Sequence, residues 1–198
     1  MIFSIYQSRE GVYWIGTLYG LASGRDTRFS KFDVTTGGLS SNSVNTFSET
    51  SDGTLWVGTD DGLNRLRPDQ ENFEWINQYT SPGISSNIVM SLLADGDRLW
   101  IGTFDSGINL LNIRTDKVKT FRHSPTDPRS VGANGITSIL KTYGGLIVIG
   151  TYGGGLSVYD ESTDSFTTYK SDPFDEKTLS NNNVIALHQD TLGHVWIG

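Results

Sequence analysis

The chain has 198 residues, enough for a sizeable core in one or two domains, and it is 36% hydrophobic with 23 Gly and only 5 Pro. This composition is typical of a globular chain with many tight turns and excludes a disordered one. The net charge of −7 argues against a nucleic-acid surface, and the absence of cysteine excludes disulfides and thiolate metal sites. No apolar run is as long as a membrane span, so we expect no membrane contact by this segment.

Short β-like segments separated by turn residues begin at the start of the chain. Ile2–Gln7 is the first, and the next contains Trp14. The segment after these, residues 21–24, reads Leu-Ala-Ser-Gly and predicts a poorly formed strand, because small residues and Gly have little to pack. The first unit therefore contains a weak third strand.

The second unit shows four such segments clearly. They cover residues 43–49, 54–59, 63–66 and 73–76. Asp52-Gly53 lies between the first two and favours a hairpin, since both residues tolerate positive φ. Four short strands in each unit, with a Gly and Trp signature that repeats, are typical of a β-propeller blade.

The signature is a tryptophan followed by Ile or Val and then Gly. It occurs at Trp14, Trp56, Trp100 and Trp196, and the fourth copy has Ile147 in place of the tryptophan. The successive spacings of 42, 44, 47 and 49 residues indicate a repeat architecture. The sequence predicts an all-β fold, an incomplete propeller arc of about four and a half four-stranded antiparallel blades. Their approximate ranges are 1–37, 38–82, 83–129, 130–178 and, for the partial blade, 179–198.

An asparagine precedes each later first segment, at Asn42, Asn87, Asn134 and Asn182. Within these segments a small residue always precedes a large apolar one, as Thr46 precedes Phe47. Because side chains alternate along a strand, the small residues share one face, which suits a strand crowded near a central axis. We therefore expect these segments to be the innermost strands, and the tryptophans to fill the wedges between neighbouring blades.

The repeat resembles the two-component regulator propeller family. The residues that carry the resemblance are Leu39-Ser40-Ser41-Asn42, Asp52-Gly53-Thr54-Leu55-Trp56-Val57-Gly58-Thr59 and Gly62-Leu63. The resemblance implies a periplasmic sensor region of a membrane-bound hybrid histidine kinase, acting as a dimer and recognising oligosaccharides. The rest of the propeller would then lie in other parts of the parent chain.

Residues that differ between blades are the candidates for ligand binding. The turns between second and third strands contain Tyr19, Asp60, Asp61, Phe104, Asp105 and Tyr152. Together they would form an aromatic and acidic rim at the axis mouth, which suits sugars because rings stack on sugar faces and carboxylates accept hydroxyl hydrogen bonds. Ordinary exposed turn residues are the alternative interpretation. The repeated asparagines are interpreted as turn-capping residues.

The sequence contains no recognisable catalytic, metal or cofactor site. The three histidines have no usual metal spacing, and the carboxylates are scattered singly. We therefore predict a non-catalytic, ligand-sensing segment that uses no cofactor. A carbohydrate-active or lyase-type enzyme remains an alternative, and it requires a histidine or carboxylate cluster at the axis mouth. A protein-interaction scaffold is the other, and it requires a broad apolar face without a small-molecule pocket.

Overall fold

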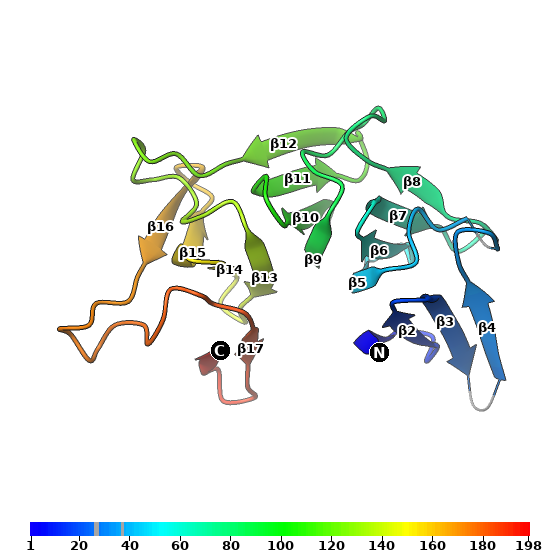
Figure 1. The fold of residues 1–198 in the computed structure, drawn as a ribbon, viewed down its shortest axis with the longest axis horizontal. Helices are drawn as coiled ribbons and strands as arrows, with labels where there is room; N and C mark the ends of the chain where they lie inside the picture. Colours follow the sequence, from blue (N-terminus) through cyan, green and yellow to red (C-terminus); the bar gives the residue numbers. More distant parts are fainter. Residues whose placement is uncertain (26–27, 37) are drawn as a thin grey trace.

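The computed structural model describes residues 1–25, 28–36 and 38–198, and it shows an all-β chain arranged as an open propeller arc (Figure 1). The first blade contains β1 (Ile2–Gln7), β2 (Tyr13–Thr17), β3 (Gly20–Arg25) and β4 (Arg28–Phe32). The second contains β5 (Val44–Glu49), β6 (Leu55–Thr59), β7 (Gly62–Leu66) and β8 (Glu74–Ile76). Both are four-stranded antiparallel sheets whose strands are ordered as in the sequence.

The later blades repeat this order. The third contains β9 (Val89–Asp95), β10 (Arg98–Thr103), β11 (Ile108–Asn112) and β12 (Lys117–Phe121). The fourth contains β13 (Ile136–Lys141), β14 (Ile147–Thr151), β15 (Gly155–Asp160) and β16 (Ser165–Tyr169). A two-stranded piece, β17 (Leu187–Gln189) and β18 (Val195–Ile197), begins the fifth. The predicted all-β arc of about four and a half blades is confirmed; the predicted blade boundaries stay predictions, and residue 37 lies outside the described residues.

The strand pairing corrects two expectations. The weak third strand predicted for residues 21–24 is in fact β3, six residues long and paired along its length with β2 and β4. The residue that replaces the tryptophan in the fourth blade is Val148 and not Ile147. Trp56 pairs with Ser48 and Val148 with Leu140, whereas Ile147 takes the position of Leu55. The spacing to the following glycine agrees with this pairing, since Val148 stands two residues before Gly150 as Trp56 stands two residues before Gly58.

The first strand of each blade lies toward the centre of the arc, where β1, β5, β9, β13 and β17 follow one another (Figure 1). Close approach of the blades there depends on glycine in the second strand. At Gly58, a Cβ atom would lie 2.6 Å from Thr46 Cγ2 of the same blade and 2.6 Å from Val89 Cγ1 of the next. The same arrangement recurs at Gly16 with Val44 and at Gly150 with Val184. At Gly102 the neighbour is Ile136, so a valine or isoleucine of each new blade packs onto the glycine of the blade before it.

The core consists of separate apolar clusters between neighbouring blades. Between the second and third blades, Trp56, Leu63 and Ile76 pack against Val89, Leu99, Ile101 and Leu111. Between the third and fourth, the ring of Trp100 lies 4.9 Å from that of Tyr159. The tryptophan position therefore faces the following blade, and Val148 does the same toward the fifth. Each blade completes the core of its neighbours, as expected of repeat architectures.

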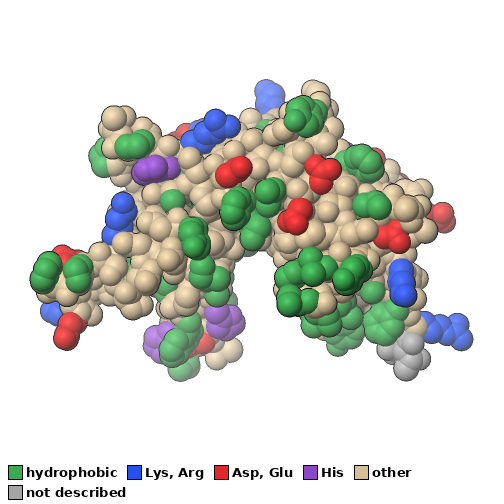
Figure 2. Space-filling view, viewed as in Figure 1, with side chains coloured by type: hydrophobic (Ala, Val, Ile, Leu, Met, Phe, Trp, Pro, Cys, Tyr) green, Lys and Arg blue, Asp and Glu red, His purple; other side chains and the backbone are tan. Residues whose placement is uncertain are grey.

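The two ends of the arc lack this cover. Trp196 is 62% exposed, and Ile2 and Ile5 of β1 are exposed as well. Both ends border the notch between the two termini (Figure 2), where hydrophobic side chains gather. Among the described residues, none belongs to a helix with the length and apolar character that crossing a bilayer requires.

Candidate functional site

Two kinds of segment meet at one end of the blades, here called the mouth end. These are the turns between second and third strands and the connections that lead into the next blade. The carbonyl of each repeated asparagine accepts a hydrogen bond from a glycine N–H of the neighbouring turn, in the pairs Asn42–Gly20, Asn87–Gly62, Asn134–Gly107 and Asn182–Gly155, at 2.6–2.9 Å. The two segments therefore form one continuous rim.

The asparagine side chains hold the same junction from the other side. Each Oδ1 accepts a hydrogen bond from a backbone N–H of the connecting segment, in the pairs Val34–Asn42, Gln78–Asn87, His123–Asn134 and Ser171–Asn182, at 2.8–3.0 Å. An asparagine carboxamide can satisfy a turn in this way without forming secondary structure of its own. These asparagines anchor the rim on which the candidate ligand residues lie.

The rim encloses a pocket of about 370 Å³ over the third, fourth and fifth blades. Two of the residues predicted for ligand binding, Phe104 and Tyr152, line it from adjacent turns, and both are exposed. Its other lining residues are Met90, Gly135, Ile136, Thr137 and Ile185. Met90, Ile136 and Thr137 lie on β9 and β13, and Gly135 and Ile185 lie just before β13 and β17. The sequence gave no signal of this pocket, because the spacing between blades determines which of these residues share a cavity.

The wall of this pocket is mostly apolar, and its polar groups are few. The hydroxyl of Thr137 donates to the carbonyl of Val184, so it is already engaged in the fold. Two aromatic rings over an apolar floor suit the flat apolar face of a ring-shaped ligand. Volume and lining together correspond to a small-molecule site rather than to a flat contact face.

The predicted acidic residues lie on the same rim but outside this pocket. Asp60 accepts a hydrogen bond from Asn45 Nδ2 at 2.9 Å, and Asp61 accepts one from Asn87 Nδ2 at 2.8 Å. Asp105 accepts one from the adjacent Ser106 hydroxyl at 3.0 Å. All three are exposed, and Figure 2 shows acidic side chains near the hydrophobic ones on one face. They can add hydroxyl-binding groups beside the aromatic pocket.

Tyr19 is placed apart from the other aromatic candidates. It belongs to the turn of the first blade and is 83% exposed, whereas Phe104 and Tyr152 lie on the third and fourth blades.

The connection that follows the first blade carries a further carboxylate at the mouth end. Hydrogen bonds from the Thr35 side chain and from the backbone of Thr36 and Thr35 hold the pKa of Asp33 at about 2. This carboxylate is therefore ionised and adds to the negative charge of the mouth end.

Within residues 1–25, 28–36 and 38–198, no three His, Asp or Glu side chains gather in a way that could hold a metal ion. His123 Nδ1 lies 2.8 Å from the carbonyl of Val131 and so packs within a connection. His194 is exposed at the opposite end of the fifth blade, with Nδ1 3.1 Å from Asp190. Each of these two histidines thus contacts residues of its own connection or hairpin.

The sequence matches the model of the two component regulator propeller family at residues 38–61 and 178–198. These segments contain the Asn-led connection and the following strands of the second and fifth blades. No curated protein sequence matches the chain.

The fold is shared with known sensor domains. The extracellular domain of BT4673 from B. thetaiotaomicron is named a one-component system in one crystal structure and a hybrid two-component system in another. It is 26% identical, with a TM-score of 0.84, and the match covers 100% of this chain and 26% of that one. The corresponding domain of BT3049 from the same organism has 22% identity and a TM-score of 0.74, covering 100% of this chain and 32% of that one. This chain thus spans about a quarter to a third of these domains.

A propeller enzyme has a similar fold. Virginiamycin B lyase from Staphylococcus aureus, in a structure with quinupristin, is 13% identical with a TM-score of 0.73; the match covers 99% of this chain and 62% of that one. At this identity the likeness concerns the fold alone.

Proposed function

This chain carries repeats of the two-component regulator propeller family, and we propose that it is a non-catalytic, ligand-sensing part of a membrane-bound signalling protein. The parent would be a hybrid histidine kinase with this segment in the periplasm. The proposal is supported by the similarity to extracellular domains of sensor proteins. The ligand would be an oligosaccharide bound at the mouth end.

The mouth pocket is the observation that carries this proposal. Phe104 and Tyr152 come from corresponding turns of adjacent blades and face one cavity. An exposed pair of aromatic rings contributes nothing to the core of its own blades, so a role in ligand contact explains it better than a role in packing. A pocket of this kind also supports small-molecule binding over the scaffold alternative.

Signalling would follow from a shift between two arrangements of a dimeric sensor. A ligand can shift such an equilibrium only by binding one arrangement better than the other. The mouth pocket extends across blades three to five, so a ligand in it would contact several blades at once. Such a ligand would favour one arrangement of these blades relative to one another, and it would thereby bias the signalling activity of the parent protein.

The remaining blades of the parent would cover the ends of this arc. Ile2 of the first blade corresponds to Val44 of the second. Val44 packs onto Gly16 of the preceding blade, whereas Ile2 is exposed. Phe29 takes the position of the buried Phe73 and is exposed as well. The back of the first blade therefore presents the side chains that elsewhere pack against a preceding blade.

The proposal is tested by measuring the binding of a panel of oligosaccharides to the 198-residue chain by calorimetry. For an oligosaccharide that binds, the double variant Phe104→Ala/Tyr152→Ala should weaken affinity at least tenfold, because stacking on both rings is lost. Unchanged affinity in this variant would contradict a site at the mouth end.

Tyr143→Ala provides the matched control. Tyr143 is also an exposed aromatic residue, but it lies in the hairpin between β13 and β14, at the opposite end of the blade. Its replacement should leave affinity unchanged. Equal losses in the control and in the double variant would indicate nonspecific aromatic stacking and would also argue against the pocket.

A further inference from the structure

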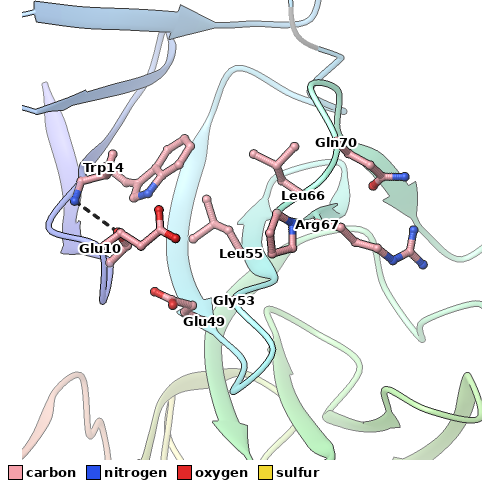
Figure 3. A pocket seen from close by; sticks show the side chains of 11 residues that line it. Glu10, Trp14, Glu49, Gly53, Leu55, Leu66, Arg67 and Gln70 are labelled. Atoms are coloured by element: carbon pink, nitrogen blue, oxygen red, sulfur yellow. Dashed lines mark hydrogen bonds between the residues drawn. The ribbon is translucent and has the colours of Figure 1, made fainter.

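A second cavity, of about 210 Å³, lies between the first and second blades at the end opposite the mouth (Figure 3). Its walls come from the β1–β2 hairpin of the first blade and from both hairpins at this end of the second. All of its lining residues belong to these two blades. Trp14, Leu55 and Leu66 form its apolar walls.

The polar groups of this cavity are mainly hydrogen-bond acceptors. Glu10 and Glu49 both line it, and the side chain of Glu49 is only 6% exposed. Glu49 Oε2 accepts hydrogen bonds from Tyr6 Oη at 3.0 Å and from the Arg9 N–H at 3.2 Å. Its other oxygen, Oε1, lies 3.9 Å from Arg9 Nε. Burial, followed by the hydrogen bond to Glu49 and its negative charge, raises the pKa of Tyr6 to about 12.

Gln70 also lines the cavity, and its Oε1 is buried and has no hydrogen-bond partner among the described residues. A buried acceptor without a donor is unfavourable, so a bound donor that reached it would be stabilised. Arg67 also lines the cavity, but its Nη1 is 2.6 Å from Glu74 Oε1, and Figure 3 shows its guanidinium directed away from the cavity.

The second blade shows what fits beside a tryptophan at this position. Arg65 is the cross-strand partner of Trp56, and its guanidinium carbon lies 5.5 Å from the centre of that ring. The same guanidinium is paired with Glu74 at 2.7 Å and with Asp116 of the third blade at 3.5 Å. In the first blade, the cross-strand partner of Trp14 is Ser23, which is too short to fill this space.

We propose that the cavity between the first and second blades binds a guanidinium group carried on a short hydrocarbon stem. The planar cation would stack on Trp14 and donate hydrogen bonds to Glu10, Glu49 and Gln70, while the stem would pack between Leu55 and Leu66. Guanidinium suits this role better than ammonium because it is planar, weakly hydrated and able to donate to several acceptors at once. The bound cation would occupy in the first blade the place that Arg65 occupies in the second.

The test uses the 198-residue chain and a pair of small probes of matched shape. Ethylguanidinium carries the charge, and N-ethylurea is its neutral counterpart. Titrations are followed through the indole N–H signals in nitrogen-15 NMR, with Trp14 assigned from Trp14→Phe. Ethylguanidinium should shift the Trp14 signal saturably, and N-ethylurea should bind at least tenfold more weakly. Equal binding of the two probes would overturn the proposal.

Variants of the cavity give an independent test. Glu10→Gln should weaken ethylguanidinium binding at least tenfold, whereas Glu176→Gln, which removes the same charge far from the cavity, should leave it unchanged. Ser23→Arg should abolish binding by supplying the guanidinium within the chain, and Ser23→Ala should not. Unchanged indole signals of Trp56 and Trp100 show that each variant is folded. Retained binding in Ser23→Arg or in Glu10→Gln would overturn the proposal.

The same titration separates the two sources of such a group. A blocked tripeptide with a central arginine tests an arginine side chain of a partner protein, and ethylguanidinium tests a free small molecule. Tighter binding of the peptide would assign the cavity to a protein partner, and equal binding would assign it to a free cation; both outcomes support the guanidinium site.

Discussion

Trp100 and Trp196 occupy the same position in two copies of one repeat, yet their surroundings are opposite. Trp100 is fully buried and stacks against Phe121 with ring centres 6.2 Å apart, whereas Trp196 is 62% exposed. The local sequence is nearly the same, so the difference comes from the surroundings. Phe121 of its own blade and Tyr159 of the following blade cover Trp100, whereas the described part of the fifth blade has only two strands around Trp196. Burial of the tryptophan therefore depends on the outer strands of its own blade and on the neighbouring blade.

The largest effect is expected from Trp100→Ala. Removing this side chain leaves a cavity between Phe121, Tyr159 and Ile136, and replacing a buried tryptophan by alanine typically costs about 3–5 kcal/mol. Urea denaturation followed by circular dichroism should show the transition midpoint at a much lower concentration. The matched change Trp196→Ala should alter the free energy of unfolding by less than about 0.5 kcal/mol.

A loss of stability in Trp196→Ala as large as in Trp100→Ala would break the comparison. It would mean that the tryptophan supports its own blade rather than the interface with the next one. The hydrogen bond from Trp196 Nε1 to Asp190 Oδ2, at 2.9 Å, is the local contact through which such support could arise.

Replacing a glycine of the second strand compares a covered and an uncovered blade near the innermost strands. Gly58→Ala would place a methyl group 2.6 Å from both Thr46 Cγ2 and Val89 Cγ1, and overpacking of this kind typically costs about 1–3 kcal/mol. Gly198, the corresponding residue of the fifth blade, has no atom within 4 Å of such a methyl group. Thermal unfolding should show a lower midpoint for Gly58→Ala and an unchanged one for Gly198→Ala.

Gly144→Ala controls for the general effect of adding a methyl group. Gly144 lies in an exposed hairpin, and a Cβ atom there would have its nearest neighbour, Thr142 Oγ1, at 3.9 Å. An equal fall in midpoint for Gly144→Ala and Gly58→Ala would show that contact between blades is not the cause.

These interfaces also explain which parts of the fold could be predicted from sequence. The tryptophan and glycine spacing predicted the blades because each copy of the repeat makes the same contact. The position of Val148 was misread as Ile147 because the aliphatic run at 146–149 hid the spacing to Gly150; Val148 stands two residues before this glycine, as Trp56 does before Gly58, and it pairs with Leu140. The strand β3 was underestimated because its support comes from two flanking strands and not from its own composition.

The candidate site could be predicted only in part for a related reason. Sequence position was enough to place Phe104 and Tyr152 in equivalent turns at one end of the blades. It could not show that Met90 and Ile185 complete the same pocket, because that depends on distances between blades. The cavity beside Trp14 was missed altogether, since its lining residues come from three hairpins of two different blades and the distances between these hairpins are not readable from the sequence.

An intermediate loss of stability is expected when the buried residue Asn109 is replaced. Asn109 is fully buried, its Oδ1 accepts a hydrogen bond from the Ser85 N–H at 2.9 Å, and its Nδ2 donates to Ser85 Oγ at 2.8 Å. Asn109→Ala leaves the Ser85 N–H without its partner, while the Ser85 hydroxyl keeps its bond to the Ser106 carbonyl, and the change should cost about 1–2 kcal/mol in urea denaturation. The first blade has Ala22 at this position, so Ala22→Gly serves as the end-blade control. A loss below about 0.5 kcal/mol in Asn109→Ala would contradict a role for this link between β11 and the connection that precedes β9.

The smallest effect concerns the acid stability of the second blade. Hydrogen bonds from Gln70 and Arg65 and the charges of Arg65 and Arg67 lower the pKa of Glu74 from 4.5 to about 2, against the opposing effect of burial. A carboxyl group with a lowered pKa in the folded state stabilises the protein above about pH 4.5, and this contribution is lost as the pH falls toward 2. Because the side chain is 38% exposed, solvent screening limits the contribution to about 1 kcal/mol or less.

Glu74→Gln should therefore flatten the fall in unfolding free energy between pH 4.5 and pH 2, measured by urea denaturation at several pH values. In the third blade the corresponding position is Lys119, the cross-strand partner of Leu110, and it lies 4.8 Å over the ring of Phe121. Lys119 Nζ is also paired with the Asp164 carboxylate, so the control is Lys119→Arg, which keeps the positive charge and the partner of Asp164. Its acid profile should keep the slope of the unaltered protein. If both variants had the same flattened profile, any change of side chain at this position would alter the acid sensitivity, and the carboxylate that holds Arg65 over Trp56 would have no special part in it.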